Sequence, residues 1–286
     1  KLPGAKTQPS YTATPDLVTD NVTKLQWQIG APRIYPGCTE YYNIGSGKSD
    51  TGELCTRAQA RDYCENLKHA TFEDWRLPTV IEVSSLFDFS TSRAYAIDGA
   101  AFADTDYGVY VTDSTYAGAP GQVWTINYYL NQTYYGASAS GKVRCVRAGG
   151  VPTFATPKDR YLVDGERVTD QATTLVWQRT AANTKFASEP PDPDEDAGVP
   201  LPLVTTACSA PWRLPTSNEL LSLIDYGKSN PAIDTVAFPN APSESFWGSA
   251  GKTTYNNMER DEFYLVDFEN GMLTSYGDEG YVRCVQ

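Results

Sequence analysis

The residues with the most reactive chemistry in this chain are few and widely separated. The sequence contains one histidine, His69, and six cysteines, none of which forms a CxxC pair. A zinc site needs several such ligands at short spacing, and a Ser-His-Asp or Cys-His centre needs a histidine beside its nucleophile. We therefore expect a protein that is not an enzyme. Two catalytic arrangements are left open by the sequence: paired carboxylates for glycoside cleavage, and a free reactive thiol.

Two short motifs suggest ligand chemistry, and both are incomplete. "GSGKS" at 45–49 resembles part of a phosphate-binding loop, but the full pattern requires glycine where Tyr42 stands. Asp192, Asp194 and Asp196 alternate as at the start of a calcium loop, but the glycine comes one position late and no closing glutamate follows. We expect two surface loops and no organic cofactor, with calcium binding at the aspartates as the alternative.

The composition excludes several classes of protein. The net charge of −12 opposes binding to nucleic acid. The sequence contains no run of about 20 apolar residues, so we expect no membrane insertion. An even number of cysteines without metal-site spacing favours disulfides, which persist in oxidising compartments. The sequence thus predicts an exported protein located outside the cell or at its surface.

The sequence contains an internal repeat. Four pairs of matching blocks occur in the same order: "LVTDNVTKLQWQ" at 17–28 with "RVTDQATTLVWQ" at 167–178, "WRLPT" at 75–79 and again at 212–216, "AIDGAAFA" at 96–103 with "AIDTVAFP" at 232–239, and "KVRCV" at 142–146 with "YVRCV" at 281–285. A period near 140 residues is too long for a solenoid. We expect an extended leader (1–15), a first domain (16–147), a linker (148–163) and a second domain (164–286).

WRLPT is better explained as a structural element than as a catalytic motif. Each copy is followed, three residues after its threonine, by a glutamate, Glu82 or Glu219. That spacing is typical of a capping box at the start of a short helix. Arg76 and Arg213 are the expected partners of buried ion pairs. Runs of β-branched and aromatic residues, divided by glycine and asparagine, follow each helix and predict strands. The expected fold class is α+β, with one or two short helices and an antiparallel sheet with long loops in each domain.

The repeat also narrows the disulfide pairing. Cys145 and Cys284 occupy equivalent positions in the two halves. Cys64 and Cys208 are each the nearest cysteine before a copy of WRLPT. The simplest pairing is therefore Cys64–Cys145 and Cys208–Cys284. Cys38 and Cys55, which flank an insertion found only in the first half, form the remaining expected pair.

Both halves resemble the Lcl C-terminal domain family, named after a collagen-like bacterial surface adhesin. The resemblance rests on "VTDNVTKLQWQ", "YCENL", "WRLPT", "AID…F" and "VRCV" in the first half and their counterparts in the second. It implies two tandem domains with a fold akin to C-type lectins. It also implies a bacterial protein that acts in adhesion or ligand binding at the cell surface, without catalysis.

Aromatic residues among Gly, Ser and Asn predict the binding surface. Tyrosine gives rigid contact area and its ring stacks on sugar faces, while small polar residues supply adaptable hydrogen bonds. The candidates are Tyr107, Tyr110, Tyr116, Trp124, Tyr128, Phe246, Trp247, Tyr255, Tyr264 and Tyr276. The expected partner is a glycan or a surface protein. The alternative function is a structural subunit of an extracellular fibre, which would involve self-association.

Overall fold

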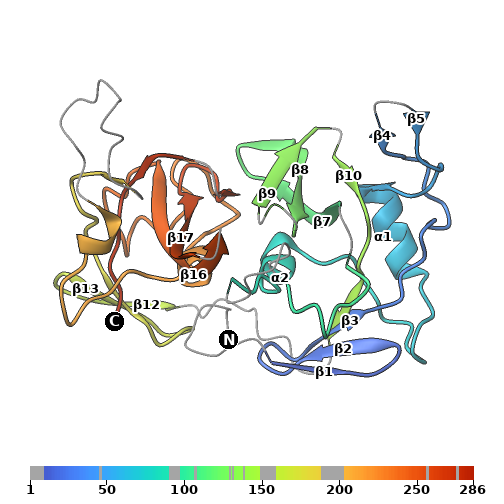
Figure 1. Ribbon diagram of the computed structural model, residues 1–286, viewed down its shortest axis with the longest axis horizontal. Helices are drawn as coiled ribbons and strands as arrows, with labels where there is room; N and C mark the ends of the chain where they lie inside the picture. Colours follow the sequence, from blue (N-terminus) through green and yellow to red (C-terminus); the bar gives the residue numbers. More distant parts are fainter. Residues whose placement is uncertain are drawn as a thin grey trace. The chain divides into compact units, whose positions relative to one another are not determined.

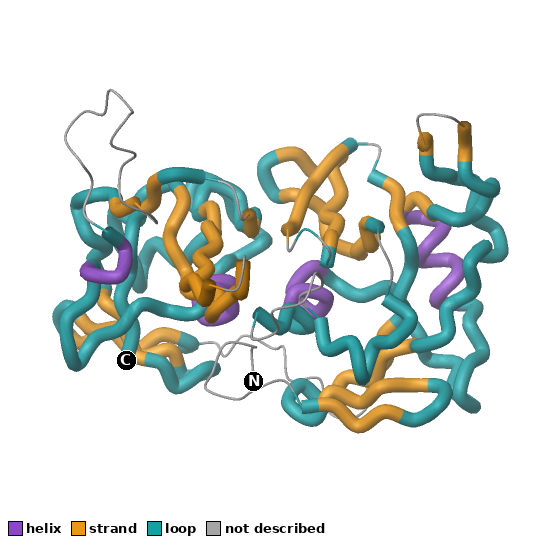
Figure 2. Tube along the Cα trace, in the orientation of Figure 1, coloured by secondary structure: helices purple, strands orange, loops and turns teal. Residues whose placement is uncertain are grey.

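The chain forms two compact units, within residues 7–153 and 154–286. The computed structural model describes residues 10–44, 47–89, 97–105, 108–128, 130, 132–137, 139–148, 159–187, 203–255, 258–274 and 277–286. Figures 1 and 2 show that strands and loops make up most of both units, with a few short helices. The fold is α+β and mainly β, and it has two tandem halves as the repeat predicts.

The first domain is built from small antiparallel sheets and two helices. One sheet has the order β1-β2-β3-β11 and another the order β7-β8-β9, while β6 pairs with β10 and β4 with β5. The two larger sheets lie at opposite edges of the domain in Figure 1. The elements are β1 (Tyr11–Ala13), β2 (Leu17–Asp20), β3 (Leu25–Gln28), β4 (Asn43–Ile44), β5 (Gly47–Lys48), β6 (Cys55–Thr56), α1 (Arg57–Glu65), α2 (Val80–Ser84), β7 (Val109–Tyr116), β8 (Ala119–Asn127), β9 (Gln132–Gly136), β10 (Ser140–Gly141) and β11 (Val146–Ala148).

The second domain repeats this plan in reduced form. Its sheets have the orders β12-β13-β14, β16-β17-β18 and β15-β19, all antiparallel. The elements are β12 (Tyr161–Asp164), β13 (Arg167–Asp170), β14 (Val176–Gln178), β15 (Phe186–Ala187), the 3₁₀ helix η1 (Val204–Thr206), α3 (Ser217–Leu221), β16 (Ser245–Tyr255), β17 (Met258–Asp267), β18 (Leu273–Thr274) and β19 (Glu279–Gly280). No α-helix is described at the place that α1 occupies in the first domain.

WRLPT begins a helix in both domains, as the capping-box spacing predicts. The Thr79 hydroxyl accepts from the Glu82 amide, and the Glu82 carboxylate accepts from the Thr79 amide; Thr216 and Glu219 do the same. Arg76 and Arg213 form the expected ion pairs with these glutamates, which are almost fully buried. In the same segment, the backbone of Arg76 exchanges two hydrogen bonds of 2.9 Å with Val146. Each copy therefore links its helix to the closing strand of its domain.

The three expected disulfides are present. Cys38 pairs with Cys55, Cys64 with Cys145, and Cys208 with Cys284, at Cα–Cα distances of 4.9, 5.6 and 5.8 Å. Two strands begin outside the bounds expected for the domains. β1 lies in the predicted leader and β12 begins at Tyr161 in the predicted linker, because both pair with the next strand of their own domain.

The two bridges of the first domain should stabilise it unequally. A disulfide limits the freedom of the unfolded chain, and the effect grows with the length of the loop that it closes. The separations of 81 and 17 residues predict that Cys64→Ala/Cys145→Ala lowers the free energy of unfolding by about 1.4 kcal/mol more than Cys38→Ala/Cys55→Ala. The difference is measured by urea unfolding of both double variants, with hydrogen exchange in β3 as the probe of the first domain. A larger loss from the short loop would contradict this expectation.

Candidate functional site

Most of the aromatic residues expected to bind a ligand lie in the core. Tyr116, Trp124, Tyr128, Phe246, Trp247 and Tyr264 are each at most 9% exposed. The strands place these rings on the face that packs inward, where Tyr128 donates to the Val83 carbonyl and Trp247 to the Phe186 carbonyl. These six rings therefore pack in the cores of their domains and do not form the exposed aromatic surface that the sequence predicts.

Other predicted residues fall outside what the structure describes. Tyr107, Tyr276 and the aspartates Asp192, Asp194 and Asp196 are not among the described residues, and the side chain of Tyr255 is not described either. In the described part of the chain, no group of three or more His, Cys, Asp or Glu is arranged to hold a metal ion.

One predicted residue, Tyr110, lines a cavity in the first domain. We call this cavity of about 260 Å³ the polar pocket; its lining is Ala31, Pro32, Arg33, Tyr35, Asp104, Tyr110, Lys142, Val143 and Arg144. Tyr35 and Tyr110 are almost fully buried and form walls, and the Tyr35 hydroxyl donates to the Val143 carbonyl. The volume lies at the small end of the range of ligand sites. It suits one sugar ring or one side chain rather than a large cofactor.

Arg144 and Asp104 form the charged part of the polar pocket. One amino group of Arg144 donates to the Asp104 carboxylate at 3.0 Å, the other donates to Thr105, and its Nε finds no partner among the described residues. Asp104 also accepts from the Gly30 amide at 2.9 Å. Burial disfavours the charged form of Arg144 and lowers its pKa. The nearby Tyr110 and Asp104 favour the charged form more strongly, so the pKa of the guanidinium is raised. Arg144 is therefore charged, and its hydrogen bonds to Asp104 and Thr105 fix it in place.

The second domain keeps the arginine but not the polar surroundings. Arg283, the equivalent of Arg144, is fully buried and lies over the rings of Phe238 and Phe246. Asn240, Phe246 and Tyr281 occupy the positions of Asp104, Tyr110 and Lys142. No carboxylate among the described residues pairs with Arg283, and burial lowers its pKa to about 10. The donors and acceptors of the polar pocket thus belong to the first domain alone.

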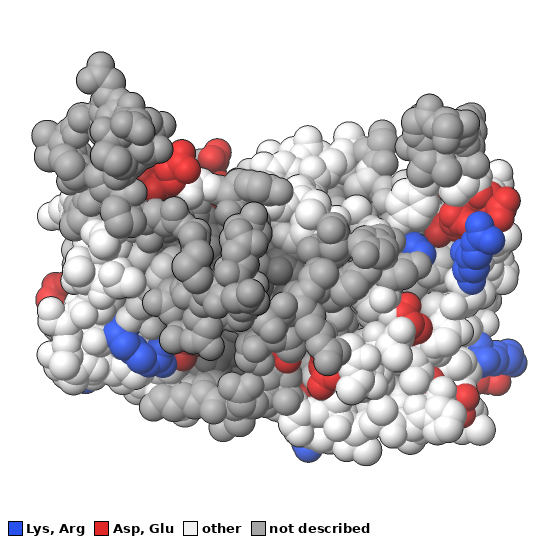
Figure 3. Space-filling view, in the orientation of Figure 1, with Lys and Arg blue, Asp and Glu red and all other residues white. Residues whose placement is uncertain are grey.

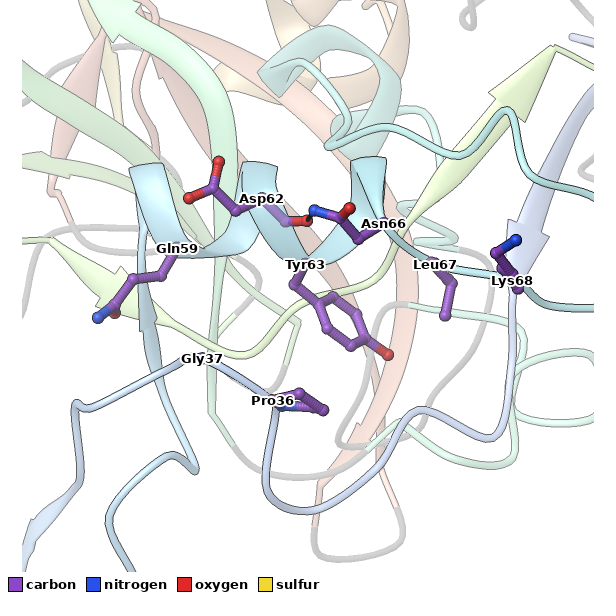
Figure 4. A pocket seen from close by; sticks show the side chains of 8 residues that line it. All are labelled: Pro36, Gly37, Gln59, Asp62, Tyr63, Asn66, Leu67 and Lys68. Atoms are coloured by element: carbon purple, nitrogen blue, oxygen red, sulfur yellow. Dashed lines mark hydrogen bonds between the residues drawn. The ribbon is translucent and has the colours of Figure 1, made fainter.

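A second cavity lies beside α1 and is larger, at about 370 Å³. We call it the α1 pocket; its lining is Pro36, Gly37, Gln59, Asp62, Tyr63, Asn66, Leu67 and Lys68. Figure 4 shows Tyr63 pointing from the helix, and Leu67 from the segment that follows it, to the side where Pro36 and Gly37 lie. Tyr63 is held there by a hydrogen bond from Gln28 and by edge-to-face contact with Tyr35. The result is an apolar floor bordered by polar side chains.

Charges of both signs adjoin on the surface of the first domain. On the face shown in Figure 3, its basic groups lie next to acidic ones. Arg33, for example, binds Asp50 and Glu53 at 3.1 and 2.6 Å. Hydrogen bonding from Ser49, reinforced by Arg33, lowers the pKa of Glu53 below its ordinary value. The described residues on this face therefore form no uniformly basic track for a long polyanion.

Apart from Tyr110, the residues that line the two cavities were missed by the sequence prediction, although signals were present. Asp104 and Asn240 stand at equivalent positions, directly after the blocks that begin with AID, and this difference marks a carboxylate that the fold alone does not require. Gln59, Asp62, Tyr63 and Asn66 recur at helical spacing on one side of "RAQARDYCENL". Differences between the two copies were more informative than the number of aromatic residues.

Two tandem, mainly β domains, each closed by an internal long-range disulfide, define the class of this protein. The Lcl C-terminal domain family matches residues 16–147 and 166–286. The chain belongs to this family and carries two tandem copies of its domain. No curated protein and no solved structure matches it. In the described residues, no helix is long and apolar enough to cross a membrane.

Proposed function

We propose that the chain is an exported, non-catalytic binding protein of the adhesin type, with C-type-lectin-like domains, which recognises a glycan through the polar pocket. The observation that carries this proposal is the Arg144–Asp104 pair, which is fixed in a small cavity whose lining also includes Lys142 and the more exposed Arg33. Such a lining supplies charged donors and a carboxylate acceptor at fixed positions, and vicinal hydroxyl groups of a sugar need both.

The second domain supports this proposal because it lacks the Asp104 carboxylate and the Lys142 charge of the polar pocket. It retains the buried arginine as a structural element but replaces Asp104, Tyr110 and Lys142 with residues that are uncharged and, in two cases, apolar or aromatic. A lining needed only for folding would be expected in both copies. We therefore assign ligand binding to the first domain and expect the second domain to contribute less to affinity.

The test is binding of the full chain to a glycan array and then to its best ligand, compared with a Lys142→Met variant. This substitution keeps the length of the side chain and removes its charge. We expect at least a tenfold loss of affinity, about 1.4 kcal/mol. Lys24→Met, at an exposed position outside both cavities, should change affinity less than twofold. Unchanged thermal unfolding confirms that both variants fold. Equal binding by the two variants would reject the polar pocket as the site.

A structural subunit is a second candidate function, and one observation favours it. β12 is the outer strand of the described sheet β12-β13-β14, and it exposes Leu162 and Val163, which are 53% and 43% accessible. At the equivalent positions of β1 stand Thr12 and Ala13. Outer strands with apolar side chains pair readily with another chain. Sedimentation of the full chain and of Leu162→Thr/Val163→Ala distinguishes the candidates, because only a subunit should form polymers that the double variant loses.

A further inference from the structure

We propose that the α1 pocket is a second binding site, independent of the polar pocket, and that it takes the basic side chain of a partner protein, a lysine or an arginine. The apolar floor of Pro36, Tyr63 and Leu67 fits the methylene stem of such a side chain. The polar border fits its charged end. Three features of the pocket lead to this assignment.

First, the unpaired groups of the border are acceptors. The Asp62 carboxylate makes no hydrogen bond or ion pair with the described residues. The Asn66 amide nitrogen donates to the backbone carbonyl of Asp62 at 2.8 Å, which leaves its own side-chain oxygen without a described donor. Gln59, in contrast, is already bonded at both ends, to Thr56 and Thr39. An ammonium or guanidinium group, which only donates, complements this set.

Second, the end of α1 is electrostatically negative and is not compensated by its own sequence. Asp62 and Glu65 lie in the last turn of the helix, where the helix dipole disfavours acidic residues, and no basic residue is present in that turn. A cation bound beside Asp62 would relieve both effects. Residues that oppose local stability in this way are expected at functional positions.

Third, the one cation of the lining does not occupy the acidic end. Lys68 binds Glu73 at 3.0 Å, and both side chains are largely exposed. In Figure 4, Lys68 lies at the opposite end of the pocket from Gln59, and the exposed Asp62 carboxylate points to the side of the helix away from Pro36. The carboxylate therefore lies at the rim of the pocket, where it can meet the charged end of a ligand whose stem lies over Tyr63.

The test is a titration of the ¹⁵N-labelled full chain with Nα-acetyl-lysine amide, monitored by the amide signals of α1. We expect saturable shifts at Asp62 and Asn66, and at least tenfold weaker binding by Asp62→Asn. Glu65→Gln removes the same charge from an exposed position of the same helix outside the pocket, and it should weaken binding less than threefold. Nα-acetyl-norleucine amide, which has the stem without the ammonium group, should bind at least tenfold more weakly than the lysine probe.

Three results would overturn the proposal. One is the absence of saturable shifts with the lysine and arginine amides. Another is equal weakening by Asp62→Asn and Glu65→Gln, which would indicate attraction by net charge alone. The third is tighter binding of glucosamine than of either amino-acid amide, which would replace a protein partner with an amino sugar. None of these results depends on the glycan-array experiment, because that experiment probes the polar pocket.

Discussion

Replacing Asp104 with asparagine is expected to destabilise the first domain by about 3 kcal/mol, because it leaves the buried Arg144 guanidinium without its carboxylate. The substitution preserves size and a hydrogen-bonding oxygen, so the loss reports the charge pair rather than a cavity. Hydrogen exchange in β3 of the full chain, compared with exchange in β14, measures the loss in the domain where it occurs. Ligand binding by the polar pocket should be lost as well.

The second domain supplies the matched control. Asn240→Asp places a carboxylate at the position equivalent to Asp104, in the domain where Nε and one amino group of Arg283 have no hydrogen-bond partner among the described residues. We expect this change to stabilise the second domain by about 1.5 kcal/mol, since a hydrogen bond to a charged group replaces unmet N–H groups. If Asp104→Asn leaves exchange in β3 unchanged, or Asn240→Asp accelerates exchange in β14, the carboxylate is not what stabilises these arginines.

The second large effect is expected at the WRLPT helix. Glu82 accepts two hydrogen bonds from Arg76 and two from Thr79, and it is 4% exposed. Glu82→Ala removes both the capping box and the ion pair, and it should lower the stability of the first domain by about 3 kcal/mol. The hydrogen bond with Glu82 also raises the pKa of Arg76, so the arginine stays charged throughout the pH range of the experiment.

Two substitutions make this second expectation specific. Arg76→Met should cost less than Glu82→Ala, because Glu82 then still accepts from the Thr79 amide and hydroxyl. Glu65→Ala, at an exposed acidic position on α1, should change stability by less than about 0.5 kcal/mol. Urea unfolding of the three variants measures these differences. A loss from Arg76→Met as large as that from Glu82→Ala would mean that the cap contributes nothing.

The sequence was sufficient for the features that repeat. Capping boxes, the Arg76 and Arg213 ion pairs and the long-range disulfides follow from residues that recur in order, and local spacing determines how they interact. The third disulfide, Cys38–Cys55, followed by elimination once the other two were placed.

The binding surface could not be inferred in the same way. A tyrosine in a β-rich segment has the same local pattern whether its ring points inward or outward, and the sheet decides which face it takes. Trp124 and Tyr128 therefore looked like ligand contacts and turned out to be core residues. The cavities depend on side chains far apart in sequence, such as Asp104 with Arg144 or Pro36 with Tyr63, and nothing in the local pattern joins them.

The closing strands determine when each domain can fold during synthesis. The Cys145 carbonyl accepts from the Gln28 amide, Val146 pairs with Arg76, and Cys145 is bonded to Cys64, so the last residues of the domain join its beginning and middle. The same holds for Cys284 with Gln178 and for Val285 with Arg213. A chain that emerges from its N-terminus therefore completes the first domain before Cys284 exists. This order separates the two related halves in time and favours the Cys64–Cys145 bridge over one between the repeats.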